Sequence, residues 1–520
     1  MKKITALRSL FLLVLLGALL FRLPLLNLRP MHNDEANQAV KFRDLLEKGE
    51  YRYDINDHHG PSLYYLTLPF IWISSGTTFA STSEIALRLV LAIFGAGLIL
   101  LLLLLKGGLN LEAIVFAGLF TAISPAMVYY SRYYIQEMLL VFFILGVLAA
   151  GWRYTQNPSP GWAAATGFFV GMAYATKETC IIAFGAIIGA LILVWVSQSK
   201  RKDKRTSPDF PGIKHLLLFL GTVILVSFLL YSSFFQNLRG ILDSILAFGA
   251  YFSRAGEASI HSHPWYYYLK MLAFSKYGTG PVWSEFLILA LGFLGGIAAF
   301  CAKSKAGFNF LFIRFISFYT LLTVVIFSLI PYKTPWNLLP FYIGFIVLAG
   351  HGAVFIIRAY KNLYFRGAIV LVLALGVLHL GVQSYQANFK FYANPNNPYV
   401  YAHTSNDFFR LIKRIHELTP YHPDHNQMLI KVITNPDETW PLPWYLRSFG
   451  QVGYWQEVDT AGELSDVPII ISSFDKSKQI QSFLHNNYLS ENFGLRPEVL
   501  LALHIKKDLW ENFMQKQAVR

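Results

Sequence analysis

Long apolar runs recur along the first 386 residues of the chain, and short polar stretches separate them. A helix needs about 20 predominantly apolar residues to cross a bilayer, so runs of this kind predict membrane spans. Eleven runs fit this description: 1–26, 84–105, 111–130, 135–151, 160–176, 178–197, 213–232, 283–302, 310–330, 336–357 and 367–386. The pattern predicts an α-helical polytopic membrane protein with about eleven transmembrane helices.

One further apolar stretch, 61–79, is assigned by the distribution of charge. If it does not span, the basic residues between the runs all fall on one side: Lys106, Arg153, 200–205, Lys303, Lys305, Arg358, Lys361 and Arg366. Short loops rich in Lys and Arg face the cytoplasm. We therefore expect an interfacial or re-entrant helix at 61–79, a cytoplasmic N-terminus and an extracytoplasmic C-terminus.

The last part of the chain, 387–520, has a different pattern and predicts a small extracytoplasmic α/β domain after a membrane domain at 1–386. Apolar strands alternate with helical patterns there, as in α/β folds. The expected strands are 428–434, 467–472 and 499–505, and the expected helices are 407–418 and 476–486. This domain is either a recognition element or lid, or a structural cap. Two long outer loops, 27–83 and 233–282, belong to the membrane domain.

Composition agrees with a membrane protein. The chain has 520 residues, 54% hydrophobic and 14% charged, whereas soluble proteins carry about 25% charged residues. The net charge of +14 follows from basic cytoplasmic loops, so no nucleic-acid partner is expected. Cys180 and Cys301 lie inside apolar runs, which excludes a disulfide framework. The first run lacks a small-x-small cleavage site, which favours an uncleaved span over a signal peptide.

The stretch from Arg29 to Glu35 leaves the first span with an adjacent acidic pair, Asp34 and Glu35, beside His32. One interpretation is a helix cap, with Asp34 opening a helix that runs through residue 46. The other is a catalytic carboxylate at the membrane surface, because two neighbouring acids can raise each other's pKa toward that of a general base. The two interpretations are compatible.

The same loop continues through residues 51–65, which combine tyrosines, acids and a His-His-Gly-Pro turn. Aromatic rings with carboxylates and amides suit a sugar-binding surface. Asp57, His58 and His59 are therefore expected to bind substrate. The same three residues could hold a divalent metal, but adjacent histidines rarely point at one ion, and no metal is expected.

Further ionisable residues occur at the outer ends of the predicted spans. Glu137 is a candidate second acid, and Arg132 could face an anionic lipid headgroup, although the two could instead form a structural ion pair. Lys177 interrupts an apolar hairpin. Lys333 lies between two prolines, where it could meet a phosphate or simply extend toward the interface. Arg254 belongs to a basic, aromatic loop that could lie along the membrane and hold a lipid carrier.

Taken together, these motifs resemble the GT-C superfamily of integral-membrane glycosyltransferases. The resemblance is to the branch of protein O-mannosyltransferases and lipid A aminoarabinose transferases. It is closer still to a prokaryotic subgroup named for association with flippase activity in protein N-glycosylation. It rests on 29–35, 58–63, 131–137, 176–178, 331–336 and 440–447, in this order. Relatives often have Lys-Pro-Pro-Leu where this chain has His59-Gly60-Pro61-Ser62-Leu63, so their donor contacts cannot be carried over to 58–61.

The resemblance implies transfer of a sugar from a polyprenyl-phosphate donor to a glycan, lipid or protein acceptor at the outer face of the cytoplasmic (inner) membrane, with inversion. Asp34 would be the general base, and Glu35 and Glu137 would position donor or acceptor. Lys333, with Arg132 or Arg254, would stabilise the departing phosphate, while His32, Asp57, His58, His59 and Lys177 would bind substrate. Relatives generally need no metal or other cofactor. The alternative is a subunit associated with a lipid-linked oligosaccharide flippase, without transferase activity. The sequence leaves the sugar and the acceptor open.

Overall fold

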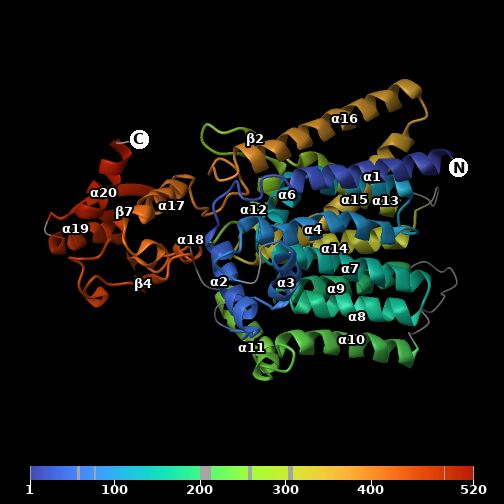
Figure 1. Ribbon diagram of the computed structural model, residues 1–520. Helices are drawn as coiled ribbons and strands as arrows, with labels where there is room; N and C mark the ends of the chain where they lie inside the picture. Colours follow the sequence, from blue (N-terminus) through green and yellow to red (C-terminus); the bar gives the residue numbers. More distant parts are fainter. Residues whose placement is uncertain are drawn as a thin grey trace.

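A bundle of long helices and a smaller α/β domain make up the molecule, with the smaller domain at one end of the bundle (Figure 1). The structure is a computed structural model that describes residues 2–55, 59–74, 78–199, 212–255, 261–301, 308–484 and 486–518. The N-terminus lies at the far end of the bundle from the α/β domain.

All eleven predicted runs are helical. The bundle helices are α1 Lys2–Arg22, α4 Glu84–Leu102, α5 Leu111–Ile123, α6 Pro125–Ser131, α7 Glu137–Gln156, α8 Pro160–Tyr174, α9 Cys180–Ser199, α10 Ile213–Tyr231, α13 Phe286–Cys301, α14 Phe310–Leu329, α15 Leu339–Ala359 and α16 Leu363–Tyr385. Within the described residues, eight helices are long and apolar enough to cross a membrane. The pair α5 and α6, bent by 61° at Ser124-Pro125, makes a ninth if it counts as one span.

Two of the predicted spans are shorter than a bilayer requires. Helix α8 has 15 residues and α13 has 16, which is about 23 Å at 1.5 Å per residue, against a hydrocarbon core of about 30 Å. Both pack against longer helices, α8 against α7 and α10, and α13 against α15. The α13–α15 contact is close because a Cβ on Gly295 would lie 2.2 Å from the carbonyl oxygen of Leu348. Small residues permit this approach between membrane helices.

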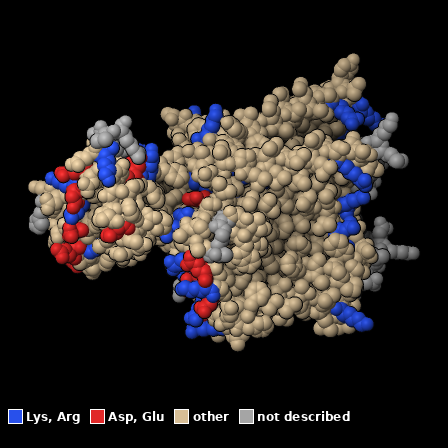
Figure 2. Space-filling view, viewed as in Figure 1, with Lys and Arg blue, Asp and Glu red and all other residues tan. Residues whose placement is uncertain are grey.

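Charged side chains divide the surface of the bundle into three zones (Figure 2). In this view, the end that holds the N-terminus shows Lys and Arg only, the broad middle shows almost no charge, and the end beside the α/β domain shows both signs. A wide uncharged band between two charged ends matches the apolar thickness of a membrane.

Short helices lie at the end of the bundle next to the α/β domain: α2 Asn33–Lys48, α3 Ser62–Ser74, α11 Arg239–Ala255 and α12 Tyr267–Ala273, followed by the hairpin β1 Ser275–Lys276 and β2 Val282–Trp283. Helix α3 covers the stretch predicted to be interfacial and, with 13 residues, is too short to span. Helix α11 exposes Leu242, Ile245 and Leu246 while it buries Ala247. An apolar exposed face is typical of a helix lying in the membrane interface.

The α/β domain follows α16, which continues as a π-helical turn, Gln386–Lys390. Its sheet has the order β4-β3-β5-β7-β6, in which β3 is parallel to β4 and β5, and β7 is antiparallel to β5 and β6. The strands are β3 Leu429–Ile433, β4 Gln451–Trp455, β5 Ile469–Ser473, β6 Tyr488–Arg496 and β7 Val499–Lys506, and the helices are α17 Asp407–Leu418, α18 Leu442–Tyr445, α19 Phe474–Phe483 and α20 Lys507–Ala518. The three predicted strands and both predicted helices are present; β4, β6, α18 and α20 had not been predicted.

Candidate active site

Helix α2 begins immediately after the first span and carries the acidic pair in its first turn. Its N-cap is His32: the Nδ1 atom accepts the N–H of Asp34 at 3.0 Å, and Glu35 accepts the N–H of His32 at 3.0 Å. This is a capping box, in which the third residue of the helix reaches back to the cap. The prediction that Asp34 is the N-cap is therefore wrong. The N-cap is His32, two residues earlier, and Glu35 is the third helical residue that bonds back to it.

His32 is buried and held at both ring nitrogens. Because Nδ1 accepts a backbone N–H, the proton sits on Nε2, which donates to the carbonyl oxygen of Tyr401 at 3.0 Å. Burial lowers the pKa of His32, against the opposing charges of Asp34 and Glu35, and the ring is neutral in this arrangement. His32, a predicted substrate-binding residue, thus caps the start of α2 in the structure.

Asp34 differs from the other predicted acids because its side chain is 44% exposed. Its charge helps to raise the pKa of Tyr133, although burial is the larger cause, and it opposes the lowering of the pKa of His261 by burial. Both side chains therefore lie within electrostatic reach of Asp34. The hydroxyl of Tyr133 is buried and finds no hydrogen-bond partner among the described residues. The carboxylate thus lies at the positive end of α2 and within electrostatic reach of Tyr133 and His261.

Glu35 points into the protein and is completely buried. Arg88 donates to both of its oxygens, from Nε to Oε1 at 2.7 Å and from Nη2 to Oε2 at 2.6 Å. Arg29 lies 3.6 Å away, and the N–H of Tyr134 donates at 2.8 Å. Burial raises the pKa of Glu35, but the two guanidinium groups outweigh this and lower it to about 2. Glu35 is fully engaged in structure, so the expectation that it contacts donor or acceptor does not fit this geometry.

Arg132 is also used internally. Its guanidinium donates to four carbonyl oxygens at the end of α1, those of Phe21, Arg22, Pro24 and Leu25, and it lies over the ring of Phe389. These are the orphan carbonyls of a helix C-terminus, which cations stabilise. Arg132 therefore neither faces a lipid headgroup nor pairs with Glu137.

Glu137 and Lys177 form a buried ion pair between the start of α7 and the turn after α8. The next residue, Glu178, accepts hydrogen bonds from His59 and from the hydroxyl of Tyr53, both at 2.9 Å. Burial raises the pKa of Glu178, but the charge and hydrogen bond of His59 bring it below its usual value. The structure thus joins the first outer loop to the 175–178 turn, as the common location of these motifs had suggested.

The turn that contains Gly60 fits tightly against the 175–178 turn. A Cβ on Gly60 would lie 2.3 Å from the carbonyl oxygen of Ala175. That oxygen accepts the N–H of Ser62 at 2.9 Å, and the Ser62 hydroxyl lies 2.7 Å from that of Thr176. The glycine is required because the two backbones are in contact.

Lys333 lies where residues 331–333 pair with residues 261–263 as a short antiparallel ladder, with Ser262 opposite Tyr332. Its Nζ donates to the carbonyl oxygens of His263, at 3.1 Å, and Ile330. Burial lowers the pKa of Lys333. The ladder places Lys333 opposite His261, whose ring lies within electrostatic reach of Asp34.

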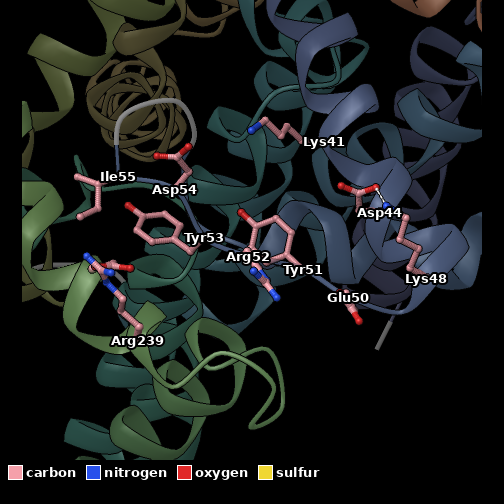
Figure 3. Close-up of a pocket in the computed structure, with 11 residues that line it drawn as sticks. Lys41, Asp44, Lys48, Glu50, Tyr51, Arg52, Tyr53, Asp54, Ile55 and Arg239 are labelled. Carbon is pink, nitrogen blue, oxygen red and sulfur yellow. Dashed lines mark ion pairs between the residues drawn. The ribbon is translucent and has the colours of Figure 1, made fainter.

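A polar groove of about 570 Å³ opens between α2, the 50–55 loop and α11. Four basic and four acidic side chains line it with two tyrosines and an isoleucine: Lys41, Asp44, Lys48, Glu50, Tyr51, Arg52, Tyr53, Asp54, Ile55, Arg239 and Asp243 (Figure 3). Residues 51–54 belong to the stretch, 51–65, in which the sequence predicts a sugar-binding surface. Tyr51 and Tyr53 are buried, so they form the floor, and the charged side chains form the rim.

Three predicted site residues cannot be placed. Asp57 and His58 lie outside the described residues, and Arg254 lies in α11 with its side chain outside them. Across the part of the chain that is described, no group of three or more His, Cys, Asp or Glu side chains could hold a metal ion.

Several residues around the site had not been predicted, among them Arg88, Trp336, Tyr401 and His403. The ring of His32 lies 4.7 Å from that of His403 and 6.0 Å from that of Trp336. Arg88 carries a detectable signal, because an arginine inside an apolar run is costly unless it is paired. Tyr401 and His403 carry no such signal, since they follow the last span in a polar segment.

Two comparisons with known proteins bear on the family and the fold of the chain. Residues 62–238 match a family model described as dolichyl-phosphate-mannose-protein mannosyltransferase. No curated protein sequence matches the chain.

Solved structures match over nearly the whole chain. The apo crystal structure of ArnT from Cupriavidus metallidurans is 16% identical, with a TM-score of 0.63 and 98% of each chain covered. The structure of ArnT bound to undecaprenyl phosphate is 15% identical, with a TM-score of 0.62, and the match covers 96% of this chain and 98% of the ArnT chain. The archaeal oligosaccharyltransferase AglB from Archaeoglobus fulgidus, in complex with an inhibitory peptide and a dolichol-phosphate, is 12% identical, with a TM-score of 0.52. That match covers 95% of this chain and 74% of the AglB chain. At these identities the likeness shows the fold, and the expected GT-C-like fold is confirmed.

Proposed function

We propose that the protein is a membrane glycosyltransferase that moves a sugar from a polyprenyl-phosphate donor to an acceptor hydroxyl, with inversion at the anomeric carbon and Asp34 as general base. The observation that carries this proposal is the contrast among the three predicted acids. Glu35 and Glu137 are buried and ion-paired, whereas Asp34 is 44% exposed at the positive end of α2. A base must reach the proton that it removes.

In the proposed reaction, the acceptor hydroxyl transfers its proton to the carboxylate of Asp34 as its oxygen bonds to the anomeric carbon. The bond between that carbon and the phosphate oxygen breaks at the same time, and the polyprenyl phosphate leaves with the electron pair. Negative charge therefore grows on the leaving phosphate. Fixed positive charge there is the largest contribution that a site of this kind can make.

Lys333 is the cation that we assign to the leaving phosphate. Two carbonyl oxygens hold its ammonium group in place, and the 261–263 segment links it to the surroundings of Asp34. Two structural relatives support a polyprenyl-phosphate donor, since ArnT has been solved with undecaprenyl phosphate and AglB with a dolichol-phosphate.

The polar groove gives the acceptor its approach in this proposal. It opens beside α2, the helix that carries Asp34, and four basic and four acidic side chains line it, which suits a polyhydroxylated molecule. Its floor touches the candidate site, because Tyr53 bonds to Glu178 next to Lys177. The acceptor would thus enter between the two outer loops.

The proposed orientation places the α/β domain outside the cytoplasm of the cell. The end of the bundle that shows only Lys and Arg (Figure 2) faces the cytoplasm in this arrangement, as the positive-inside rule requires. Asp34 then works at the outer leaflet.

The experiment that tests the activity uses purified protein in lipid vesicles with polyprenyl-phosphate sugars and acceptor lipids extracted from the host membranes. Mass spectrometry follows loss of the donor and gain of one sugar on an acceptor, and nuclear magnetic resonance follows the anomeric configuration. Transfer with inversion is expected. Retention, or no transfer from any extracted donor, contradicts the proposal.

A further inference from the structure

The α/β domain reaches back to the loop that precedes Asp34. The N–H of Met31 donates to the hydroxyl of Tyr445 at 2.9 Å, and the hydroxyl of Thr404 donates to the carbonyl oxygen of Met31 at 2.7 Å. Met31 is completely buried. Both polar groups of this residue are therefore satisfied by side chains more than 370 positions away in the sequence.

The next residue is held from the same side. The Nε2 of His32 donates to the carbonyl oxygen of Tyr401, in the linker that enters the α/β domain. Its Nδ1 in turn accepts the N–H of Asp34. Three contacts from 401–445 thus act on Met31 and on His32, which is the N-cap of α2. We call these contacts the Met31 clamp.

The opposite side of the loop is held by the membrane domain. Arg88 donates to the carbonyl oxygens of Leu26 and Arg29, at 2.7 and 2.8 Å, and to Glu35. The α/β domain and Arg88 bond to different backbone groups of residues 26–35. Both are therefore needed to define the path of this loop.

The α/β domain is anchored where the clamp requires it. Helix α18 packs against α2, and the indole Nε1 of Trp444 donates to Glu84 at 2.8 Å, at the start of α4. Arg447 donates to the carbonyl oxygen of Thr82 at 2.6 Å and lies over the Trp444 ring. The anchor fixes α18, and Tyr445 is the last residue of that helix.

We propose that the α/β domain is a positioning element of the active site, and that Thr404 and Tyr445 are positioning residues that set the carboxylate of Asp34 through Met31 and His32. The inference rests on the proposed role of Asp34 as base. A domain that only capped the bundle would need the anchor at Trp444 and Arg447, but not hydrogen bonds to both polar groups of Met31.

The consequence is a loss of turnover without a loss of binding. A shift of about 1 Å in a reacting group can cost about 100-fold in rate. Removing the two hydroxyls, in Thr404→Val with Tyr445→Phe, is expected to lower kcat about 10- to 100-fold and to leave the KM for the donor within about twofold. No donor-binding group is touched.

Matched variants separate positioning from folding. Thr404→Ser restores the hydroxyl and is expected to rescue kcat relative to Thr404→Val. Tyr488→Phe serves as the control, because its hydroxyl bonds to the carbonyl oxygens of Leu464 and Val467 inside the α/β domain and does not reach the clamp. If the double variant fails to fold, the Thr404→Val and Thr404→Ser pair alone decides the outcome.

The experiment measures kcat and donor KM with the extracted polyprenyl-phosphate sugars, together with deuterium exchange of residues 30–36 in the full-length protein. The expected result is faster exchange in the clamp variants, not in Tyr488→Phe, and a lower kcat with an unchanged KM. Unchanged exchange, or full kcat in the double variant while Asp34→Asn is inactive, overturns the clamp and leaves the proposed function intact. Full activity of Asp34→Asn removes the proposed function, and the exchange measurement then decides the clamp by itself.

Discussion

Arg88 binds both carboxylate oxygens of Glu35 inside the protein, at 2.7 and 2.6 Å, and so fixes the residue adjacent to the proposed base. The same guanidinium bonds to carbonyl oxygens of the loop before α2. The pair therefore joins α4 to the first turn of α2. Because Glu35 is part of a capping box with His32, this junction also sets where α2 begins.

Removing one partner of this pair should destabilise the protein. Glu35→Gln leaves the Arg88 guanidinium buried without its counter-charge, which typically costs about 3–5 kcal/mol. Thermal unfolding of the purified protein measures the loss. Replacing both partners by apolar residues, Glu35→Leu with Arg88→Met, should recover part of the stability. A double variant as unstable as Glu35→Gln would argue against an ion pair as the cause.

The pair also predicts how stability depends on pH. The pKa of Glu35 is lowered from 4.5 to about 2, so its contribution is fully present above pH 4.5 and is lost as the pH falls toward 2. The contribution is about 3 kcal/mol, at 1.36 kcal/mol for each pKa unit. Unfolding temperatures measured from pH 7 to pH 2 should fall less steeply in Glu35→Gln than in the wild type. Parallel curves would contradict this assignment.

Lys333 should affect the donor rather than the acceptor. Lys333→Met removes the charge proposed to meet the leaving phosphate and should lower kcat/KM for the donor about 10²- to 10³-fold. Lys333→Arg keeps the charge and should lose less. Lys276→Met, at an exposed lysine in β1, is the control. Equal losses in the Met and Arg variants would indicate that the fold of the 331–333 segment is affected instead.

The groove predicts a complementary effect on the acceptor. Arg52→Ala removes an exposed side chain from its rim and should raise the KM for the acceptor about tenfold, the equivalent of one charged hydrogen bond. The KM for the donor should stay unchanged. Arg43→Ala, an exposed residue of α2 that does not line the groove, should have no effect. An equal effect of both variants would point to net charge rather than to the groove.

Orientation is testable with single cysteines. Cys180 is buried and Cys301 is exposed, so the exposed cysteine is first removed by Cys301→Ser. Into this variant we introduce either Ser482→Cys on α19 or Lys361→Cys between α15 and α16. A membrane-impermeant maleimide should label the α19 cysteine in intact cells and the other only after permeabilisation. The reverse pattern would invert the topology.

The sequence pattern predicted the helices well because membrane spans depend on local composition. It overestimated the lengths of α8 and α13, which have 15 and 16 residues and pack against longer helices. In the α/β domain, β4 and β6 were missed because Gly453 and the polar Ser490, Glu491 and Asn492 weaken their strand signals.

The sequence predicted which segments form the candidate site, but it did not predict what each residue in those segments does. The position of the motifs brought the first loop and the 175–178 turn together, as the structure has them. It did not separate Asp34 from Glu35, because their difference depends on Arg88, 53 positions from Glu35. Nor did it show that Arg132 would bond to the end of α1, since that requires the three-dimensional path of the chain.

The role of Asp34 as base is the central claim, and Asp34→Asn tests it most directly. The amide keeps the shape of the side chain but cannot accept the proton, so transfer from a polyprenyl-phosphate sugar should fall at least about 10²- to 10⁴-fold. Donor binding and unfolding temperature should stay at wild-type values, and Asp424→Asn, at an exposed carboxylate of the α/β domain that does not line the groove, should remain active. Wild-type transfer by a folded Asp34→Asn protein would contradict the account.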